Sequence, residues 1–236
     1  MGFRNEVIVA LAVAAGLAAC GSPTEGGIEP RNKARAELLP ENAVVVDFEQ
    51  GNAGTLPPGF RASLTGDGQP GRWELAEVAD APSGRRVLAQ QDGDATEQRF
   101  PLCVFDSVRA RDVHASVSFR AFGGEDERSV GLMVRYRDKD NYYVVRASAL
   151  DGNVRLDKVV GGKRKQFAGT SVAVRPERWH ALGVELKGDR FRVYLDGRLL
   201  FEASDRTLGE AGRVGVWTHA DSLAWFDDLA VAALDG

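Results

Sequence analysis

The segment Arg190–Phe201 limits most strongly what this chain can fold into. Phe191, Val193 and Leu195 alternate with charged or polar side chains, and a period of two residues is typical of a strand with one buried face. The dipeptide Asp-Gly at 196–197 follows, and it favours a two-residue hairpin turn because both central residues of that turn need a positive φ. The segment therefore predicts two adjacent antiparallel strands.

Similar short β-rich segments, separated by Gly and Asp turns, continue from Ala43 onward. No amphipathic pattern of helical period longer than a turn or two interrupts them, and residues 54–71 are expected to form a loop rich in Pro and Gly. Short strands at this spacing indicate an all-β sandwich or barrel. The predicted strands are 44–49, 72–78, 86–90, 97–105, 113–122, 129–136, 142–148, 153–160, 163–168, 179–186, 190–195, 198–203, 213–219 and 223–232.

The first twenty residues have the pattern of an export signal. Arg4 precedes the apolar run Val7–Ala19, which is too short to span a bilayer and ends in small residues. The closing Leu-Ala-Ala-Cys resembles the bacterial lipobox, in which the cysteine is lipidated; a plain signal peptide is the alternative. We therefore expect a lipoprotein signal peptide at 1–19 and lipidation of Cys20.

A flexible tether is expected to follow the lipidated cysteine. Residues 20–42 are rich in Gly, Pro and charge, and they cannot bury enough apolar surface to offset the entropy of ordering. The folded domain is predicted at 43–236, exported and held at the cell envelope (outer membrane, periplasm or cell surface) by the Cys20 lipid. Cys103 lies in an apolar run, which predicts a buried free thiol.

The overall charge excludes one class of partner. The formal net charge is −4 at pH 7, with 30 Lys and Arg against 34 Asp and Glu. A nucleic-acid-binding domain shows clustered positive charge, so no nucleic-acid partner is predicted.

Several motifs together resemble the concanavalin A-like, laminin-G-like domains of secreted bacterial proteins. They are Arg-Tyr-x-Asp-x-x-Asn-Tyr-Tyr at 135–143, Trp-His at 179–180, Leu-Asp-Gly at 195–197, Gly-x-x-Gly-x-Trp at 212–217 and Phe-Asp-Asp at 226–228. The resemblance implies an antiparallel two-sheet jelly-roll β-sandwich with one concave face, which often binds carbohydrate. Relatives include family 16 glycoside hydrolases and 3-keto-disaccharide hydrolases.

The catalytic motifs of these relatives are not matched. Family 16 enzymes carry Glu-x-Asp-x-x-Glu on one strand, which points both glutamates at the sugar. The nearest segment here, Asp92–Glu97, begins with Asp and lies in a polar stretch typical of a turn. We therefore predict no catalytic residues, and a glycoside hydrolase or lyase remains the alternative.

A calcium site is a further expectation from the resemblance. In jelly rolls of this kind the first and last strands lie together, and a structural calcium can join them. Glu49 and Asp227 are the predicted ligands, whereas the alternative is that Asp227 marks a bulge at the edge of a sheet. No cofactor is predicted to be required.

The predicted ligand-binding face depends on the register of residues 131–160. We predict that Tyr136 faces Tyr142 across the break at 138–141, that Val134 pairs with Val144, and that Arg146 faces Asp157 across the next turn. One face would then carry Leu132, Val134, Tyr136, Tyr142, Val144, Arg146 and Asp157, and the opposite face, with Gly131, Met133, Val145 and Leu156, would join the core. A register error of one residue would exchange these faces.

The residues of the first face suit a sugar. Tyr136 and Tyr142 offer aromatic rings to its C–H edges, and Arg146 and Asp157 offer charge-assisted hydrogen bonds to its hydroxyls. Trp217 is a weaker candidate for this face. An aromatic pair beside an ordinary ion pair is the alternative interpretation. The leading hypothesis is thus a non-catalytic, lipid-anchored domain that binds a glycan or envelope polysaccharide, and a purely structural surface protein is the third possibility.

Overall fold

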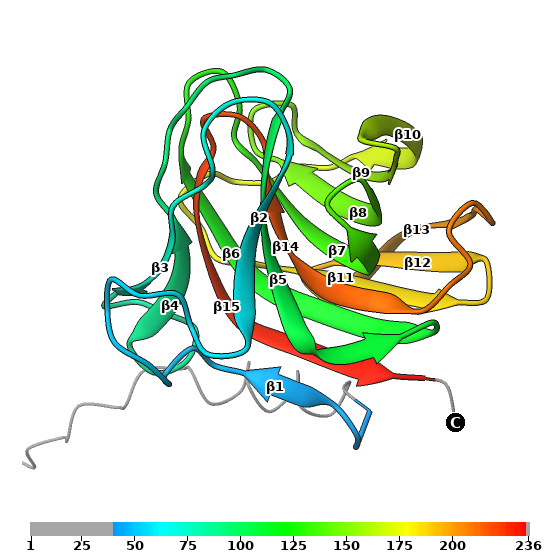
Figure 1. Cartoon of the computed structure of the whole chain (residues 1–236), viewed down its shortest axis with the longest axis horizontal. Coiled ribbons are helices and arrows are strands. Elements are labelled where there is room, and N and C mark those ends of the chain that lie inside the picture. Colours follow the sequence, from blue (N-terminus) through cyan, green and yellow to red (C-terminus); the bar gives the residue numbers. More distant parts are fainter. Residues whose placement is uncertain (1–39, 235–236) are drawn as a thin grey trace, which may run out of the picture.

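A computed structural model describes residues 40–234 of the chain. Two antiparallel sheets pack face to face, one of 8 and one of 7 strands (Figure 1). The described residues contain no helix, and so no helix long and apolar enough to cross a membrane. The prediction of an all-β, two-sheet sandwich is confirmed.

We call the two layers sheet A and sheet B. Sheet A has the order β13 (Arg198–Ser204), β12 (Arg190–Leu195), β11 (His180–Lys187), β6 (Val113–Gly123), β15 (Leu223–Ala233), β4 (Arg86–Gln90) and β3 (Trp73–Glu77), with β1 (Val44–Val46) also paired to β15. Sheet B has the order β10 (Lys163–Ser171), β9 (Asn153–Val160), β8 (Asn141–Ser148), β7 (Ser129–Asp138), β14 (Gly212–Thr218), β5 (Arg99–Ala110) and β2 (Phe60–Gly66). The first and last strands therefore lie together, as expected.

Strand β2 corrects one sequence-based prediction. The segment was expected to belong to a loop, but it pairs along its whole length with β5, from Phe60 opposite Phe105 to Gly66 opposite Arg99. Phe60 joins the core whereas Arg61 points outward, which is the period of a strand. The Pro and Gly residues just before Phe60 hid this alternation.

The main core lies between the two sheets. Phe119 and Phe226 of sheet A pack in one cluster with Leu132, Val145 and Leu156 of sheet B, and all five are fully buried. Burial of this apolar surface, at about 25 cal/mol per Å², supplies most of the free energy that holds the layers together. The buried free thiol predicted at Cys103 is confirmed.

The register of β7 also differs from the prediction. Met133 lies opposite Val144 and Val134 opposite Tyr143, so Leu132 and Val134 face the core whereas Gly131 and Met133 point outward. The pairing is interrupted after Val134, where Arg135 has a φ of 48°. This bulge returns Tyr136 to the outer face beside Tyr142.

The pairing of β8 with β9 is displaced by two residues from the predicted one. Arg146 lies opposite Arg155, and Asp157 lies opposite Val144. A shift of two residues keeps every side chain on its predicted face.

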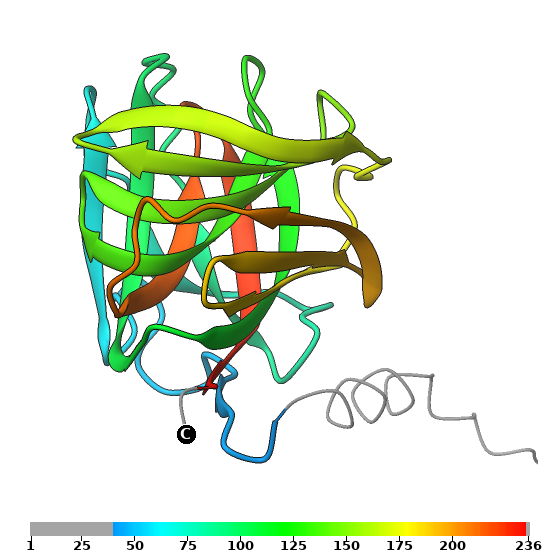
Figure 2. The same ribbon diagram turned by 90° about the vertical axis from the view of Figure 1, so that its right-hand side faces the viewer.

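The outer face of sheet B curls over a second apolar group. Thr65 of β2 donates a hydrogen bond to the carbonyl oxygen of Lys139 in the β7–β8 turn, and its hydroxyl lies 3.0 Å from Tyr142 Oη. Figure 2 shows β7 to β10 running across the direction of β2 with their turns beside it. The side chains enclosed by this curl, here called the outer cluster, are Phe100, Leu102, Val104, Met133, Tyr136, Tyr142, Val144, Val159 and Trp217.

Candidate functional site

Two arginines share one buried carboxylate beside the outer cluster. Arg146 Nε lies 3.2 Å from Asp157 Oδ2, and Arg164 Nη1 from β10 lies 2.8 Å from the same oxygen. The Asp157 side chain is 0% exposed, whereas those of Arg146 and Arg164 are 8% and 23% exposed. Arg164 is therefore the accessible cation of this site, whereas Arg146 is buried with Asp157.

Glu127, in the loop between β6 and β7, lies near Arg146. Its carboxylate accepts a hydrogen bond from Ser129 Oγ at 2.8 Å and lies 3.0 Å from His219 Nδ1. Burial alone would raise the pKa of Glu127, but the contacts with His219 and Ser129, together with the charge of Arg146, lower it below its ordinary value. We call Glu127, Arg146, Asp157, Arg164 and His219 the sheet-B cluster.

One oxygen of this cluster has no partner. Asp157 Oδ1 is buried and accepts no hydrogen bond from any described residue. A buried carboxylate oxygen without a donor costs free energy, and so a hydroxyl or water that reached it would be stabilising. The geometry thus leaves one strong acceptor inside a cluster whose other faces are guanidinium groups.

Aromatic rings join the sheet-B cluster to the outer cluster. Arg164 lies 5.2 Å from the centre of the Phe100 ring, and that ring lies 4.9 Å from His219 and stacks on Trp217 at 5.5 Å. The Trp217 ring packs directly over β7 because its neighbour on that strand is Gly131. A Cβ atom at this position would lie 2.6 Å from Val144 Cγ2 and 3.1 Å from Trp217 Cε3. The glycine is therefore a packing requirement.

The structure brings all five predicted binding residues onto the outer face of sheet B, but two of them belong to the sheet-B cluster and three to the outer cluster. Arg146 and Asp157, predicted as ligand-binding residues, form an ion pair, which was the alternative interpretation of the sequence. Tyr136, Tyr142 and Trp217 are 2%, 0% and 0% exposed, so they pack inside the outer cluster and offer no open platform to a sugar. The aromatic part of the predicted site is thus structural packing.

The sequence-based prediction missed Glu127, Arg164, His219 and Phe100. Arg164 and Gln166 alternate along β10, so the outward direction of Arg164 could have been read from the strand pattern. Glu127 comes from a loop, and nothing in its sequence neighbourhood places it beside a histidine that lies 92 positions later.

A second polar group lies at Tyr136. The Arg61 guanidinium sits 5.2 Å from the centre of the Tyr136 ring, and Asp106 accepts from Arg61 Nε at 3.0 Å and lies 2.8 Å from Arg213 Nε. Asp106 is thus shared by two arginines, and Arg61 covers the tyrosine ring. They extend the closed part of the face.

The acidic segment at 92–97 serves the fold. Asp92 and Asp94 lie in the connection between β4 and β5, where Asp92 binds the fully buried guanidinium of Arg99 at 2.5 Å. Asp94 accepts hydrogen bonds from the backbone of Gln69 and from Thr96, and these, with the Thr96 hydroxyl bond largest, lower its pKa to about 2. Both carboxylates are engaged in holding loops together.

The two predicted calcium ligands, Glu49 and Asp227, bind the backbone at the two ends of the short segment 83–86. Glu49 accepts the backbone N–H groups of Arg85 and Arg86 at 2.7 and 2.6 Å, and Asp227 accepts that of Ser83 at 2.9 Å. Burial, and then the charge of Asp228, raise the pKa of Asp227 to about 7, so a cation beside it would stabilise its ionised form.

No group of three or more His, Cys, Asp or Glu side chains within 40–234 is arranged to hold a metal. Calcium readily takes backbone carbonyl oxygens, so the two carboxylates fit an ion that would complete its shell with carbonyls and water. The calcium site stays a prediction.

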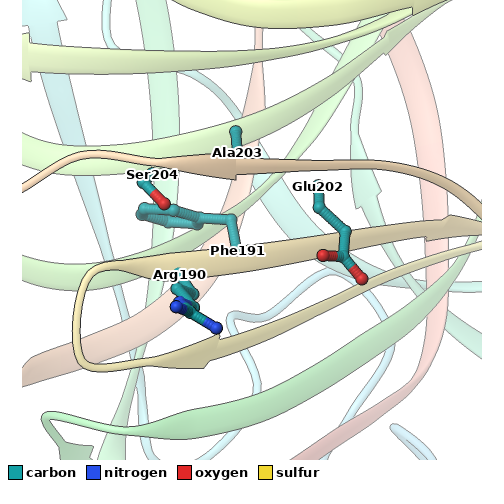
Figure 3. Close-up of a pocket in the computed structure, with 5 residues that line it drawn as sticks. All are labelled: Arg190, Phe191, Glu202, Ala203 and Ser204. Carbon is teal, nitrogen blue, oxygen red and sulfur yellow. The ribbon is translucent and has the colours of Figure 1, made fainter.

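Two surface hollows lie away from the sheet-B cluster. One is on the edge strands of sheet A and is lined by Arg190, Phe191, Glu202, Ala203 and Ser204 (Figure 3). The other lies over Arg135, whose guanidinium donates to the carbonyl oxygens of Arg111, Leu208 and Gly188. Those bonds occupy Arg135 in joining three loops.

Comparison with known proteins places the fold. The chain is 27% identical over 179 residues to the levanase of Bacillus subtilis (strain 168), a match that covers 75% of this chain and 24% of the levanase. The chain thus spans about a quarter of that enzyme's length. No protein-family model matches the chain.

Two solved structures of known proteins have the same fold as this chain. Carbohydrate binding module CBM66 from Bacillus subtilis superposes with a TM-score of 0.57 at 23% identity, covering 74% of this chain and 96% of the module. The β-glucanase of Bacillus licheniformis superposes with a TM-score of 0.53 at 8% identity, covering 81% of this chain and 98% of the glucanase. The predicted concanavalin A-like jelly-roll sandwich is confirmed.

Proposed function

We propose that this protein binds a glycan through the sheet-B cluster and does not cleave it. The observation that carries the proposal is the Arg164 guanidinium, which the buried carboxylate of Asp157 holds in place while the Arg164 side chain stays 23% exposed. A sugar hydroxyl is both donor and acceptor, so it can accept from the exposed part of Arg164, and the 28% exposed Glu127 of the same cluster offers an acceptor to hydroxyl donors. Bonds of this charge-assisted kind are short and strong.

A ligand can reach the cluster through its two partly exposed side chains, Arg164 and Glu127. The Arg164 side chain lies across the Phe100 ring and is the most exposed cation of the cluster, and the carboxylate side chain of Glu127 is 28% exposed. The outer cluster behind them is closed by the bond from Thr65 to the β7–β8 turn. A ligand therefore approaches from the side of Glu127.

The similar proteins support this choice of ligand. One is a levanase and another is a carbohydrate binding module, and the module is matched over nearly its whole length. A jelly roll does not by itself fix a function, so the argument depends on the cluster. Levan is accordingly the first polysaccharide to test.

The electrostatics of the cluster oppose catalysis. Glycoside hydrolysis needs one carboxylic acid whose pKa is raised so that it can protonate the leaving group. The pKa of Glu127 is lowered, and Asp157 is buried between two arginines. Glu127 is therefore not suited to donate a proton at neutral pH, which favours binding over cleavage.

Binding can be tested by retardation in native gels that contain levan, inulin or barley β-glucan. Arg164→Ala and Glu127→Gln remove hydrogen bonds worth about 1.5–3 kcal/mol, so each should weaken binding by about tenfold or more. Arg206→Ala is the matched control, because the Arg206 side chain is 88% exposed and pairs with Asp189 elsewhere. Unchanged retardation in both cluster variants would show that the glycan binds at another place.

We also propose that a lipid on Cys20 holds the domain at the cell envelope. The support is the sequence pattern at 1–20, which lies outside the described residues. Cys20→Ala should abolish labelling by a fatty-acid analogue and release the protein from the membrane fraction. Undiminished labelling of that variant would exclude Cys20 as the attachment point.

A further inference from the structure

The outer face of sheet A carries three aromatic side chains that belong to neither apolar cluster. Phe122 of β6 and Trp225 of β15 lie 4.4 Å apart between ring centres, and Trp179, just before β11, lies 6.4 Å from Trp225 with 29° between the ring planes. Each of the three side chains is half-buried. They are absent from the main core and from the outer cluster.

This placement is not explained by packing between the sheets. Along β6 and β15, Phe119 and Phe226 point into the core, so Arg120, Phe122 and Trp225 point away from it. A large aromatic ring contributes most when it is removed from water, and an exposed aromatic patch commonly marks a binding surface. The three rings therefore form a surface that a partner could cover.

Polar groups border these rings. The Arg120 guanidinium lies 5.2 Å from the centre of the Trp225 ring and donates to Asp80 Oδ2 at 2.7 Å, and the Asp80 side chain is 66% exposed. Two donors, Trp179 Nε1 and Arg120 Nε, are buried and have no hydrogen-bond partner among residues 40–234. We call Phe122, Trp179, Trp225, Arg120 and Asp80 the sheet-A patch.

The backbone beside the patch is held in place. The N–H of Glu177 donates to the carbonyl oxygen of Ala121 at 3.0 Å, which ties the connection before β11 to the end of β6. Trp179 follows two residues later, so its position beside Phe122 and Trp225 is set before any partner binds. A preformed surface loses less entropy on binding.

We infer that the sheet-A patch is a second glycan-binding site, separate from the sheet-B cluster. The C–H faces of neutral sugar rings would pack on Trp225, Phe122 and Trp179, while their hydroxyls would donate to Asp80 and accept from Trp179 Nε1 or Arg120 Nε. Aromatic rings beside planar polar groups suit a polysaccharide better than an anionic partner, because Asp80 already occupies Arg120. The two sites lie on opposite outer faces of the sandwich, so one molecule could hold two chains.

The test uses the full chain and the same three polysaccharides, levan, inulin and barley β-glucan, in native gels. Trp179→Ala and Asp80→Ala should each weaken retardation at least tenfold, since loss of either site removes the gain from two-point attachment. Combined with Arg164→Ala, either variant should abolish retardation. Tyr194→Ala is the matched control, because Tyr194 is another half-buried aromatic residue of sheet A outside the patch.

The outcomes separate this inference from the proposed function. Loss of binding in the patch variants but not in Arg164→Ala supports the sheet-A patch and removes the sheet-B cluster, and the reverse result overturns the patch. Asp80→Ala keeps the test valid if a tryptophan variant fails to fold, since the Asp80 side chain is largely exposed. Retardation by none of the polysaccharides, or a dimer in sedimentation that the patch variants dissociate, would overturn the inference.

Discussion

The two outer faces of the sandwich use aromatic residues in opposite ways. Sheet B curls, and its Tyr142 and Trp217 are fully enclosed in the outer cluster, so that Arg164 and Glu127 are partly exposed beside them but the rings are not. Sheet A leaves Trp179 and Trp225 half-buried beside Arg120. The contrast teaches that the curvature of a sheet decides whether an outward-facing aromatic residue is core or surface.

The largest expected effect on stability comes from the outer cluster of sheet B. Trp217→Ala should lower the free energy of unfolding by about 3–5 kcal/mol, because a large side chain is removed from a dense cluster and leaves a cavity. Urea unfolding of the variant measures this. A loss below 1 kcal/mol would mean that the outer cluster is not packed as described.

The buried carboxylate of sheet A gives the next effect. Asp227 has a pKa raised to about 7 by burial and by Asp228, so its contribution to stability is present below the pKa of an unfolded Asp and is lost as the pH rises through 7. Three pKa units correspond to at most about 4 kcal/mol. Urea unfolding in chelator should show this loss between pH 4 and 8, and Asp227→Asn should remove it.

Calcium gives a direct check of the same residue. If Glu49 and Asp227 bind the ion, calcium at a hundred times its Kd should add about 2.7 kcal/mol at pH 7. Glu49→Gln should diminish that gain. Identical unfolding curves with calcium and with chelator would remove calcium from the account.

A smaller effect on stability is expected from one methyl group added beside the outer cluster of sheet B. Gly131→Ala would place its Cβ at 2.6 Å from Val144 Cγ2 and 3.1 Å from the Trp217 ring, so the variant should lose about 1–3 kcal/mol through overpacking. Gly197→Ala is a useful comparison, because Gly197 has open space but a φ of 77°, and its cost would be conformational. A neutral Gly131→Ala would indicate a loose contact between the sheet and Trp217.

The smallest effect on stability should come from the sheet-A patch. Trp225→Ala is expected to cost less than about 1.5 kcal/mol, because its ring is half-exposed and lies outside both clusters. Comparison with Trp217→Ala in the same urea series tests the contrast between the faces directly. Equal losses would show that the sheet-A patch is structural packing.

Alternation along single strands was predictable, and contacts between distant segments were not. The hairpin at 190–201 was recognised because its apolar period and its Asp-Gly turn are local properties. The bulge at Arg135 depends on carbonyl oxygens of Arg111 and Leu208, which belong to loops far away in the sequence. One bulge was enough to exchange the faces of Leu132 and Met133.

In the candidate site, too, residues on neighbouring strands were predictable and contacts between distant segments were not. Arg146 and Asp157 were found because they lie on neighbouring strands, and a register error of two residues kept them on one face. Arg164 reaches Asp157 from the neighbouring strand β10, and Glu127 comes from the loop between β6 and β7, which no local pattern places beside them. The enclosure of Tyr142 depends on Thr65, 77 residues away, in a strand that the sequence did not reveal.

Arginine side-chain NMR tests the central claim, that a glycan is held at the sheet-B cluster. The Nε–Hε signals of Arg146 and Arg164 should shift as levan oligosaccharide, or whichever glycan of the panel binds, approaches saturation. Arg135 is the internal control, because its guanidinium is buried among loop carbonyls on the other side of the bulge. Saturated binding that leaves the signals of Arg146 and Arg164 unmoved would contradict the account.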